Sequence, residues 1–149
     1  VVTYVDLDTF FKSADIISIH MNYAPGKNDK FIDAKKIAAM KKDAILVNCA
    51  RGELLDNEAA VSAVENGRLA GLALDVIPNE KGIFNKAFDS VQKMNDPLMA
   101  RMVALYPKVL ITPHLGSATD QALSDMVEVS LKNMDEYLAA GTCKNSLIK

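Results

Sequence analysis

The chain has little of what marks a metal, membrane or nucleic-acid protein. Its 149 residues include two cysteines, Cys49 and Cys143, which are far apart and in no metal-ligand spacing. No apolar run approaches the roughly 18–20 residues that span a membrane. The net charge is −2 and there is no basic block to attract nucleic acid or an anionic membrane. We therefore expect no metal site, no nucleic-acid partner and no membrane span, and a reduced, cytoplasmic protein is the simplest fit.

A starting methionine and a signal peptide are also lacking. The sequence opens at Val1 in the middle of an apolar pattern, so we expect a fragment of a longer protein. Half of the residues are apolar and 24% are charged, which is an ordinary globular composition. This length predicts one domain, because domains commonly run to about 100–200 residues.

The most informative stretch runs from Ala44 to Asp56. Its apolar start, Ala44–Val47, is typical of a strand that is buried on both faces of a parallel sheet. Gly52 permits a tight turn, and Asp56 can cap the helix that follows. Arg51 then lies just past the carboxyl end of a strand, where open α/β sheets bind ligands. Its guanidinium suits a carboxylate or a phosphate, or it could cap local carbonyls or pair with Glu53.

Helical and strand patterns alternate along the rest of the chain. This alternation predicts an α/β fold, with a parallel Rossmann-like sheet and helices on both faces. The connection over residues 77–95 is longer than most strand-to-helix loops, and long loops are often functional. The expected helices begin at Asp6–Asp8, Asp33, Asp56, Asp96–Pro97 and Asp120, and the expected strands are 15–20, 44–47, 69–76 and 109–112.

Right-handed crossovers place the carboxyl ends of parallel strands at one edge of the sheet. The chain's only two histidines both follow predicted strands, so one edge collects a cation, imidazoles and carboxylates. Such a set could reduce a keto group or hydrolyse a bond. The residues expected there are His20, Arg51, Asp75, Glu80 and His114.

Each member of this set has a simpler interpretation when it is taken alone. His114 could be a turn histidine that bonds a backbone carbonyl, and Asp75 could cap a strand end. Glu80 could be a solvated loop charge. Cys49 is adjacent to nothing in sequence that would activate it as a nucleophile, so we expect a small packing residue. Only the joint placement of these residues favours a functional site.

Three blocks of the sequence, Val47–Asp56, Gly71–Val76 and Ile111–Thr119, resemble the D-isomer-specific 2-hydroxyacid dehydrogenases. They occur in that family's order and spacing, and the resemblance covers essentially the whole chain. The loop segment Gly82–Asn85 resembles the D-lactate and D-2-hydroxyisocaproate dehydrogenase branch. Leu115–Ala118 instead resembles the glycerate and glyoxylate branch, so the size of the substrate stays open.

The resemblance implies a role for each residue that matches a family motif. Arg51 would hold the substrate carboxylate and keto oxygen. His114 would donate a proton when the keto acid is reduced, and Glu80 would hydrogen-bond the histidine and favour its charged form. Asp75 would contact the nicotinamide end of NAD, and Lys27 is an alternative to Asn28. The cofactor-binding residues implied are His20, Met21, Asn22, Asn28, Cys49, Ala50, Arg51 and Asp75.

The resemblance further implies that residues 1–149 are the second half of a doubly wound NAD-binding domain with a C-terminal helix and tail. The family's G-x-G-x-x-G turn does not occur in the sequence, so we expect it and the substrate domain upstream. The implied function is hydride transfer between NAD(H) and a 2-keto acid or D-2-hydroxy acid, such as pyruvate or D-lactate, in a homodimer. The alternatives are a non-enzymatic NAD-sensing or corepressor-like scaffold of the same fold, and a hydrolase that uses Cys49.

Overall fold

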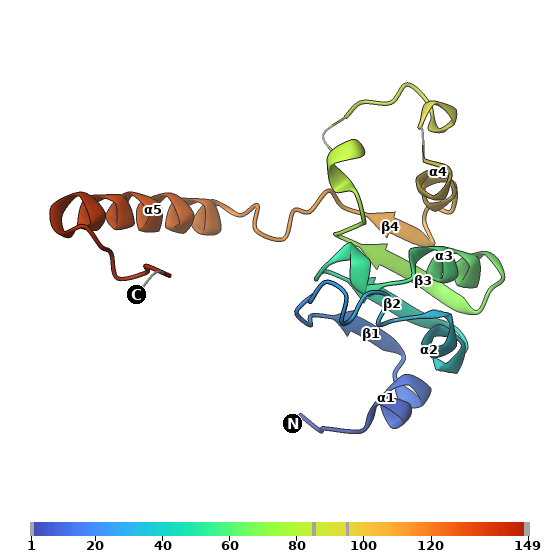
Figure 1. Cartoon of the computed structure of the whole chain (residues 1–149). Coiled ribbons are helices and arrows are strands. Elements are labelled where there is room, and N and C mark those ends of the chain that lie inside the picture. The colour runs from blue at the N-terminus through green and yellow to red at the C-terminus, as the bar shows by residue number, and fades with distance from the viewer. Residues whose placement is uncertain (1, 85, 95, 148–149) are drawn as a thin grey trace. The chain divides into compact units, whose positions relative to one another are not determined.

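The computed structural model describes residues 2–84, 86–94 and 96–147 (Figure 1). The chain forms two compact units, one ending at His114 and the other beginning at Leu115.

The first unit contains a four-stranded parallel sheet with the strand order β1-β2-β3-β4 (Figure 1). This arrangement confirms the predicted parallel α/β sheet, and the strand bounds differ from the expected ones by at most two residues. The strands are β1 (Ile16–Ile19), β2 (Ala44–Asn48), β3 (Leu69–Leu74) and β4 (Val109–Ile111), and the helices are α1 (Leu7–Ser13), α2 (Ala34–Ala39), α3 (Asn57–Glu65) and α4 (Pro97–Ala104).

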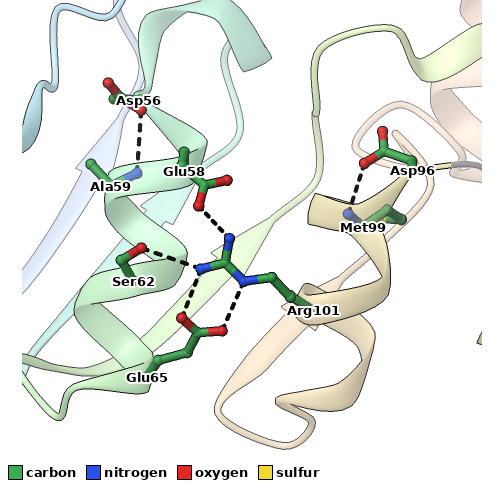
Figure 2. A network of polar contacts seen from close by, with 8 residues as sticks. All are labelled: Asp56, Glu58, Ala59, Ser62, Glu65, Asp96, Met99 and Arg101. Carbon is green, nitrogen blue, oxygen red and sulfur yellow. Dashed lines mark hydrogen bonds and ion pairs between the residues drawn. The ribbon is translucent and has the colours of Figure 1, made fainter.

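The helices of the first unit begin at the aspartates that the sequence indicates. Each of the four carboxylates accepts a hydrogen bond from the backbone amide three residues further on, which is the N-cap interaction. Two of these caps, Asp56 with Ala59 and Asp96 with Met99, are visible in Figure 2. A cap of this kind is worth about 1 kcal/mol, so local sequence largely decides where the helices start. The four caps are Asp6, Asp33, Asp56 and Asp96.

The core of the first unit lies on one face of the sheet. Alternate strand residues, such as Ile17, Leu46 and Leu72, are almost completely buried there. Apolar side chains of the helices complete the same cluster, among them Ile37, Val61, Val64, Met99 and Met102.

The opposite face of the sheet is exposed in the first unit. Ile16, Ile45 and Leu110 retain 64%, 38% and 50% of their accessible surface. The prediction that helices cover both faces is therefore not met by the described residues up to His114, and neither is the burial of both faces of Ala44–Val47. The reason is topological. The strand order advances in one direction, so right-handed crossovers place α2, α3 and α4 on the same side.

The second unit is dominated by α5 (Asp120–Ala140). Thr119 caps its start by accepting from the amide of Ala122, and Gly141 ends it with a φ of +67°, which favours glycine. Apolar side chains recur along α5 at helical spacing and are exposed within this unit, including Leu123, Met126, Val127, Leu131, Met134, Tyr137 and Leu138. Among the helices described, none combines the length and the apolar character that crossing a membrane requires.

Candidate active site

The carboxyl ends of the four strands carry the residues that the sequence predicts for one edge. His20 follows β1, Arg51 lies in the turn after β2, Asp75 follows β3 directly and His114 follows β4. The parallel pairing of the strands brings these four positions to the same edge of the sheet. Ligands of open α/β sheets bind at this edge.

The side chain of Asn48 stabilises the turn that carries Arg51 through two hydrogen bonds. The side-chain Nδ2 of Asn48 donates to the Arg51 carbonyl at 2.9 Å, and its Oδ1 accepts from the Ala50 amide at 3.1 Å. The Arg51 guanidinium donates through Nη1 to the Ala50 carbonyl at 2.7 Å. Arg51 thus caps a local carbonyl, as one of its alternative interpretations expects. The residue is exposed.

Gly52 allows this turn to lie against the loop that follows β3. A Cβ atom built on Gly52 would overlap the backbone of Ile77 and Pro78 and would come within 2.7 Å of the Ile77 Cα. No larger residue fits unless one of the two backbone segments moves. Gly52 therefore determines how closely Arg51 approaches the loop that carries Glu80.

His114 and Glu80 form the hydrogen-bonded pair that the resemblance implies. The Nδ1 of His114 lies 3.0 Å from the Glu80 Oε2, and the Glu80 Oε1 accepts from the Ile77 amide at 3.3 Å. The Glu80 side chain is 28% exposed, so it is not a freely solvated loop charge. The imidazole thus bonds a carboxylate rather than a backbone carbonyl. The catalytic roles of the two residues stay predictions.

The backbone also fixes the position of His114. Its φ is +54°, an uncommon value for a residue other than glycine. The His114 amide donates to the Asp75 carbonyl at 2.9 Å, which ties the end of β4 to the end of β3. The Thr112 hydroxyl donates to the Asp75 carboxylate at 2.5 Å and strengthens the same link. Thr112 was not singled out by the sequence interpretation, because its position opposite Asp75 depends on the sheet register.

A cavity of about 560 Å³ brings the three predicted catalytic residues together. Arg51, Glu80 and His114 all line it. The sequence interpretation missed Lys81, a second cation at this cavity, although it directly follows Glu80. The complete lining is Arg51, Gly52, Glu53, Ile77, Asn79, Glu80, Lys81, Gly82 and His114.

A second cavity of about 470 Å³ adjoins the first at Arg51, which lines both. Six of the eight predicted cofactor-binding residues surround it. Cys49 is exposed, so the expectation that it is a small packing residue is wrong. The lining residues are His20, Met21, Asn22, Tyr23, Cys49, Ala50 and Arg51.

The other two predicted cofactor-binding residues, Asn28 and Asp75, do not line either cavity. The Asn28 side chain donates to the Asn22 carbonyl at 2.8 Å and accepts from the Ala24 amide at 2.7 Å. Asn28 therefore shapes the loop after β1, while its proposed contact with the cofactor stays a prediction. Lys27, the alternative, is exposed.

A tyrosine–aspartate pair stabilises the same loop. The Tyr23 hydroxyl donates to Asp29 at 2.5 Å, and Asp29 also accepts from the Gly26 amide at 2.6 Å. The hydrogen bond to the carboxylate raises the pKa of Tyr23 to about 12 and lowers the pKa of Asp29 below its ordinary value. Sequence reasoning had no signal for this pair, because its members lie six positions apart in an irregular loop. In residues 2–84, 86–94 and 96–147, no group of three or more histidine, cysteine or acidic side chains could hold a metal ion.

A parallel α/β sheet with a cation, an imidazole and a carboxylate at its carboxyl edge defines a ligand-binding domain of the Rossmann-like class. The family model described as "D-isomer specific 2-hydroxyacid dehydrogenase, NAD binding domain" matches residues 1–116. The chain belongs to this family.

Curated relatives carry names that agree with the family. An aromatic 2-oxoacid reductase of Clostridium sporogenes is 41% identical over 99% of this chain and 44% of the relative. A D-lactate dehydrogenase of Escherichia coli is 34% identical over 99% of this chain and 44% of the relative. The chain thus spans less than half the length of these relatives.

Solved structures share the fold. A D-lactate dehydrogenase from Sporolactobacillus sp. superposes with a TM-score of 0.90 at 35% identity, over 99% of this chain and 43% of that one. A D-lactate dehydrogenase from Lactobacillus jensenii, solved with NAD+, has a TM-score of 0.86 at 36% identity over the same shares.

Proposed function

We propose that the protein containing this chain is an NAD-dependent D-2-hydroxyacid dehydrogenase that interconverts 2-keto acids and D-2-hydroxy acids. The observation that carries the proposal is the cavity shared by Arg51 and the hydrogen-bonded pair of His114 and Glu80. The cavity combines a donor for a carboxylate with a proton donor, which are the two groups that keto-acid reduction needs.

Arg51 would bind the substrate. Its planar guanidinium can donate two parallel hydrogen bonds to a carboxylate, and the Ala50 carbonyl accepts one of its N–H groups in this structure. A bound carboxylate would replace a neutral acceptor with a charged one, which forms the stronger hydrogen bond. The substrate would then be anchored beside His114.

His114 would move the proton. Its Nδ1 is directed at Glu80, so Nε2, on the other side of the ring, is the atom that would face the keto oxygen. The Glu80 carboxylate orients the ring through Nδ1, and the Ile77 amide donates to the same carboxylate. Proton transfer to the keto oxygen would leave a neutral imidazole that keeps its hydrogen bond to Glu80.

The second cavity fits the nicotinamide end of NAD. Its lining includes His20, Met21, Asn22, Cys49 and Ala50, and Arg51 lines both this cavity and the proposed substrate cavity. Because the two cavities meet at Arg51, a cofactor in one would lie beside a keto acid in the other. When bound, the nicotinamide supplies or accepts the hydride.

The relatives favour catalysis over the two alternative functions. They are named as reductases and dehydrogenases of 2-oxo or 2-hydroxy acids, which gives no support to a corepressor-like scaffold or to a Cys49 hydrolase. The same names support pyruvate, or a 2-oxo acid with an aromatic side chain, as substrate.

The test is oxidation of NADH by the full-length gene product. Pyruvate and phenylpyruvate should each be tried, with a ketone that lacks a carboxylate as the control. We expect turnover with at least one 2-keto acid, none with the ketone, and none with the His114→Ala variant. An enzyme that accepts the ketone equally well would refute carboxylate binding by Arg51.

We further propose that the full-length protein is a homodimer and that it is cytoplasmic. Two free cysteines, Cys49 and Cys143, are consistent with a reducing compartment, and the homodimer rests on the family resemblance. Light scattering of the full-length gene product would measure its mass in solution, and a mass of one chain would contradict the dimer.

A further inference from the structure

Asn48 is one of two buried polar residues among those described in the chain, and its side chain is completely inaccessible. A buried amide is costly unless its groups are hydrogen-bonded. Asn48 is the last residue of β2, yet both of its side-chain groups bond the following turn rather than the sheet. Nδ2 donates to the Arg51 carbonyl and Oδ1 accepts from the Ala50 amide.

These two bonds hold the backbone on both sides of the peptide bond that joins Ala50 to Arg51. The Arg51 carbonyl also accepts from the Leu54 amide at 3.2 Å, where the short helical turn Gly52–Leu54 begins. Asn48 thus connects the end of β2 to the start of that turn. The direction of the Arg51 side chain depends on this backbone, because the residue is exposed and its Nη1 donates to the Ala50 carbonyl of the same segment.

The main chain of Asn48 joins the turn to the next strand. Its carbonyl accepts from the Asp75 amide at 3.0 Å, and the Asp75 carbonyl accepts from the His114 amide at 2.9 Å. The same residue is therefore bonded to the Arg51 turn through its side chain and to the His114 side of the site through its backbone. A rigid connection between the two halves of a cavity is what accurate placement of a substrate requires.

We propose that Asn48 is a positioning residue for substrate binding: its side-chain amide fixes the backbone from Ala50 to Arg51, so that the guanidinium faces the cavity lined by His114. This inference rests on the proposed dehydrogenase function. It assigns Asn48 no contact with the substrate, and its effect on the reaction is transmitted through Arg51.

The test is a double-mutant cycle with Arg51 in the full-length gene product. Asn48→Ser removes the donor to the Arg51 carbonyl and should lower kcat/KM for the 2-keto acid by about 10- to 100-fold, the range expected for a misplaced binding group. In an Arg51→Lys background the same change should lower kcat/KM by less than about threefold, because a lysine has no bidentate geometry left to lose.

Asn57→Ser is the matched control. Asn57 is also buried, 5% exposed, and its Nδ2 donates to the carbonyls of Gly52 and Leu55 at 3.0 and 2.9 Å. Its loss should affect stability in a similar way. Any effect of Asn57→Ser on kcat/KM should be the same fold-change in the parent and in the Arg51→Lys background.

The results distinguish a failure of the proposed dehydrogenase function from a failure of the role proposed for Asn48. A parent protein without turnover of any 2-keto acid would refute the proposed function, and the inference with it. If the parent is active but Asn48→Ser lowers kcat/KM by the same factor with Arg51 and with Arg51→Lys, only the role proposed for Asn48 is overturned. A merely structural residue would act independently of Arg51. Should Asn48→Ser fail to fold, Asn48→Asp keeps the size and the acceptor for Ala50, and the same coupling with Arg51 is expected of it.

Discussion

The properties of single residues explain most of the chemistry that we assign to this chain. Arg51 supplies two donors in one plane, and His114 bonds Glu80 through one ring nitrogen while the other is directed elsewhere. Neither property depends on the charge of the residue alone. Conservative substitutions therefore distinguish geometry from charge at both positions.

Replacement of Arg51 by lysine preserves the charge and removes the planar pair of donors. We expect Arg51→Lys in the full-length gene product to cost about 2–4 kcal/mol of transition-state stabilisation, since one ammonium group cannot hold a carboxylate and the adjacent keto oxygen together. Steady-state kinetics with a 2-keto acid measure the loss as a ratio of kcat/KM. A variant within a few-fold of the parent would refute the assignment of Arg51.

Gly52 is expected to tolerate no side chain. A Cβ at this position overlaps the backbone of Ile77 and Pro78, so Gly52→Ala should destabilise the fold by about 1–3 kcal/mol, as overpacking does. It should also lower kcat/KM, because it separates the Arg51 turn from the loop of Glu80.

Gly82→Ala is the control for Gly52→Ala. Gly82 lines the same cavity, but a Cβ there would meet no atom within 4 Å. Urea denaturation of the two variants gives their free energies of unfolding. Equal stabilities for both would show that the close approach at Gly52 is unimportant.

At the scale of whole elements, α3 and α4 are joined by one arginine. Arg101 of α4 donates to both carboxylate oxygens of Glu65 at 2.9 and 2.7 Å, to Ser62 at 3.2 Å and to Glu58 (Figure 2). α4 precedes β4, and β4 leads to His114. This network therefore supports the helix next to the strand that leads to His114.

The network makes a pH-dependent contribution to stability. The hydrogen bond from Arg101 lowers the pKa of Glu65 below its ordinary value, so the unfolded chain binds more protons than the folded one in acid. The stabilisation is present above the ordinary pKa of a glutamate and is lost as the pH falls through the lowered value. Glu65→Gln should therefore destabilise the protein at about pH 7 and have less effect at about pH 3.

Urea denaturation of the full-length gene product at several pH values measures this difference. Glu128→Gln on α5 serves as the control. The Glu128 carboxylate accepts only from the Ser124 hydroxyl, at 3.4 Å, among the contacts of the described residues. A destabilisation by Glu65→Gln that does not change with pH would contradict the ion pair.

For the molecule as a whole, local features of the sequence were the most predictable ones. The helix starts at Asp6, Asp33 and Asp56 follow from side chains that bond amides three residues away, a short-range interaction. The gathering of Arg51 and His114 at one edge followed from the alternation of elements and the handedness of crossovers.

Features that depend on tertiary structure could not be predicted. Ala44, Ile45, Leu46 and Val47 are all apolar, so the sequence does not reveal that Ile45 is exposed in the first unit while Leu46 is buried. The bonds of Asn48 and the contact of Gly52 with Ile77 require the geometry of the turn. Asparagine and glycine are common in turns, so their presence in the sequence does not by itself predict these particular contacts.

The central claim is that His114 donates the proton for keto-acid reduction with Glu80 as its partner. The most direct measurement is kcat/KM for 2-keto acid reduction by the full-length gene product, its Glu80→Gln variant and its His114→Ala variant. The Glu80 carboxylate lies 3.0 Å from the His114 Nδ1 and orients the ring, so Glu80→Gln should lower kcat/KM by about 10- to 100-fold, part of what general acid catalysis supplies. His114→Ala should abolish reduction. A Glu80→Gln variant within a few-fold of the parent, or substantial activity in His114→Ala, would contradict the account.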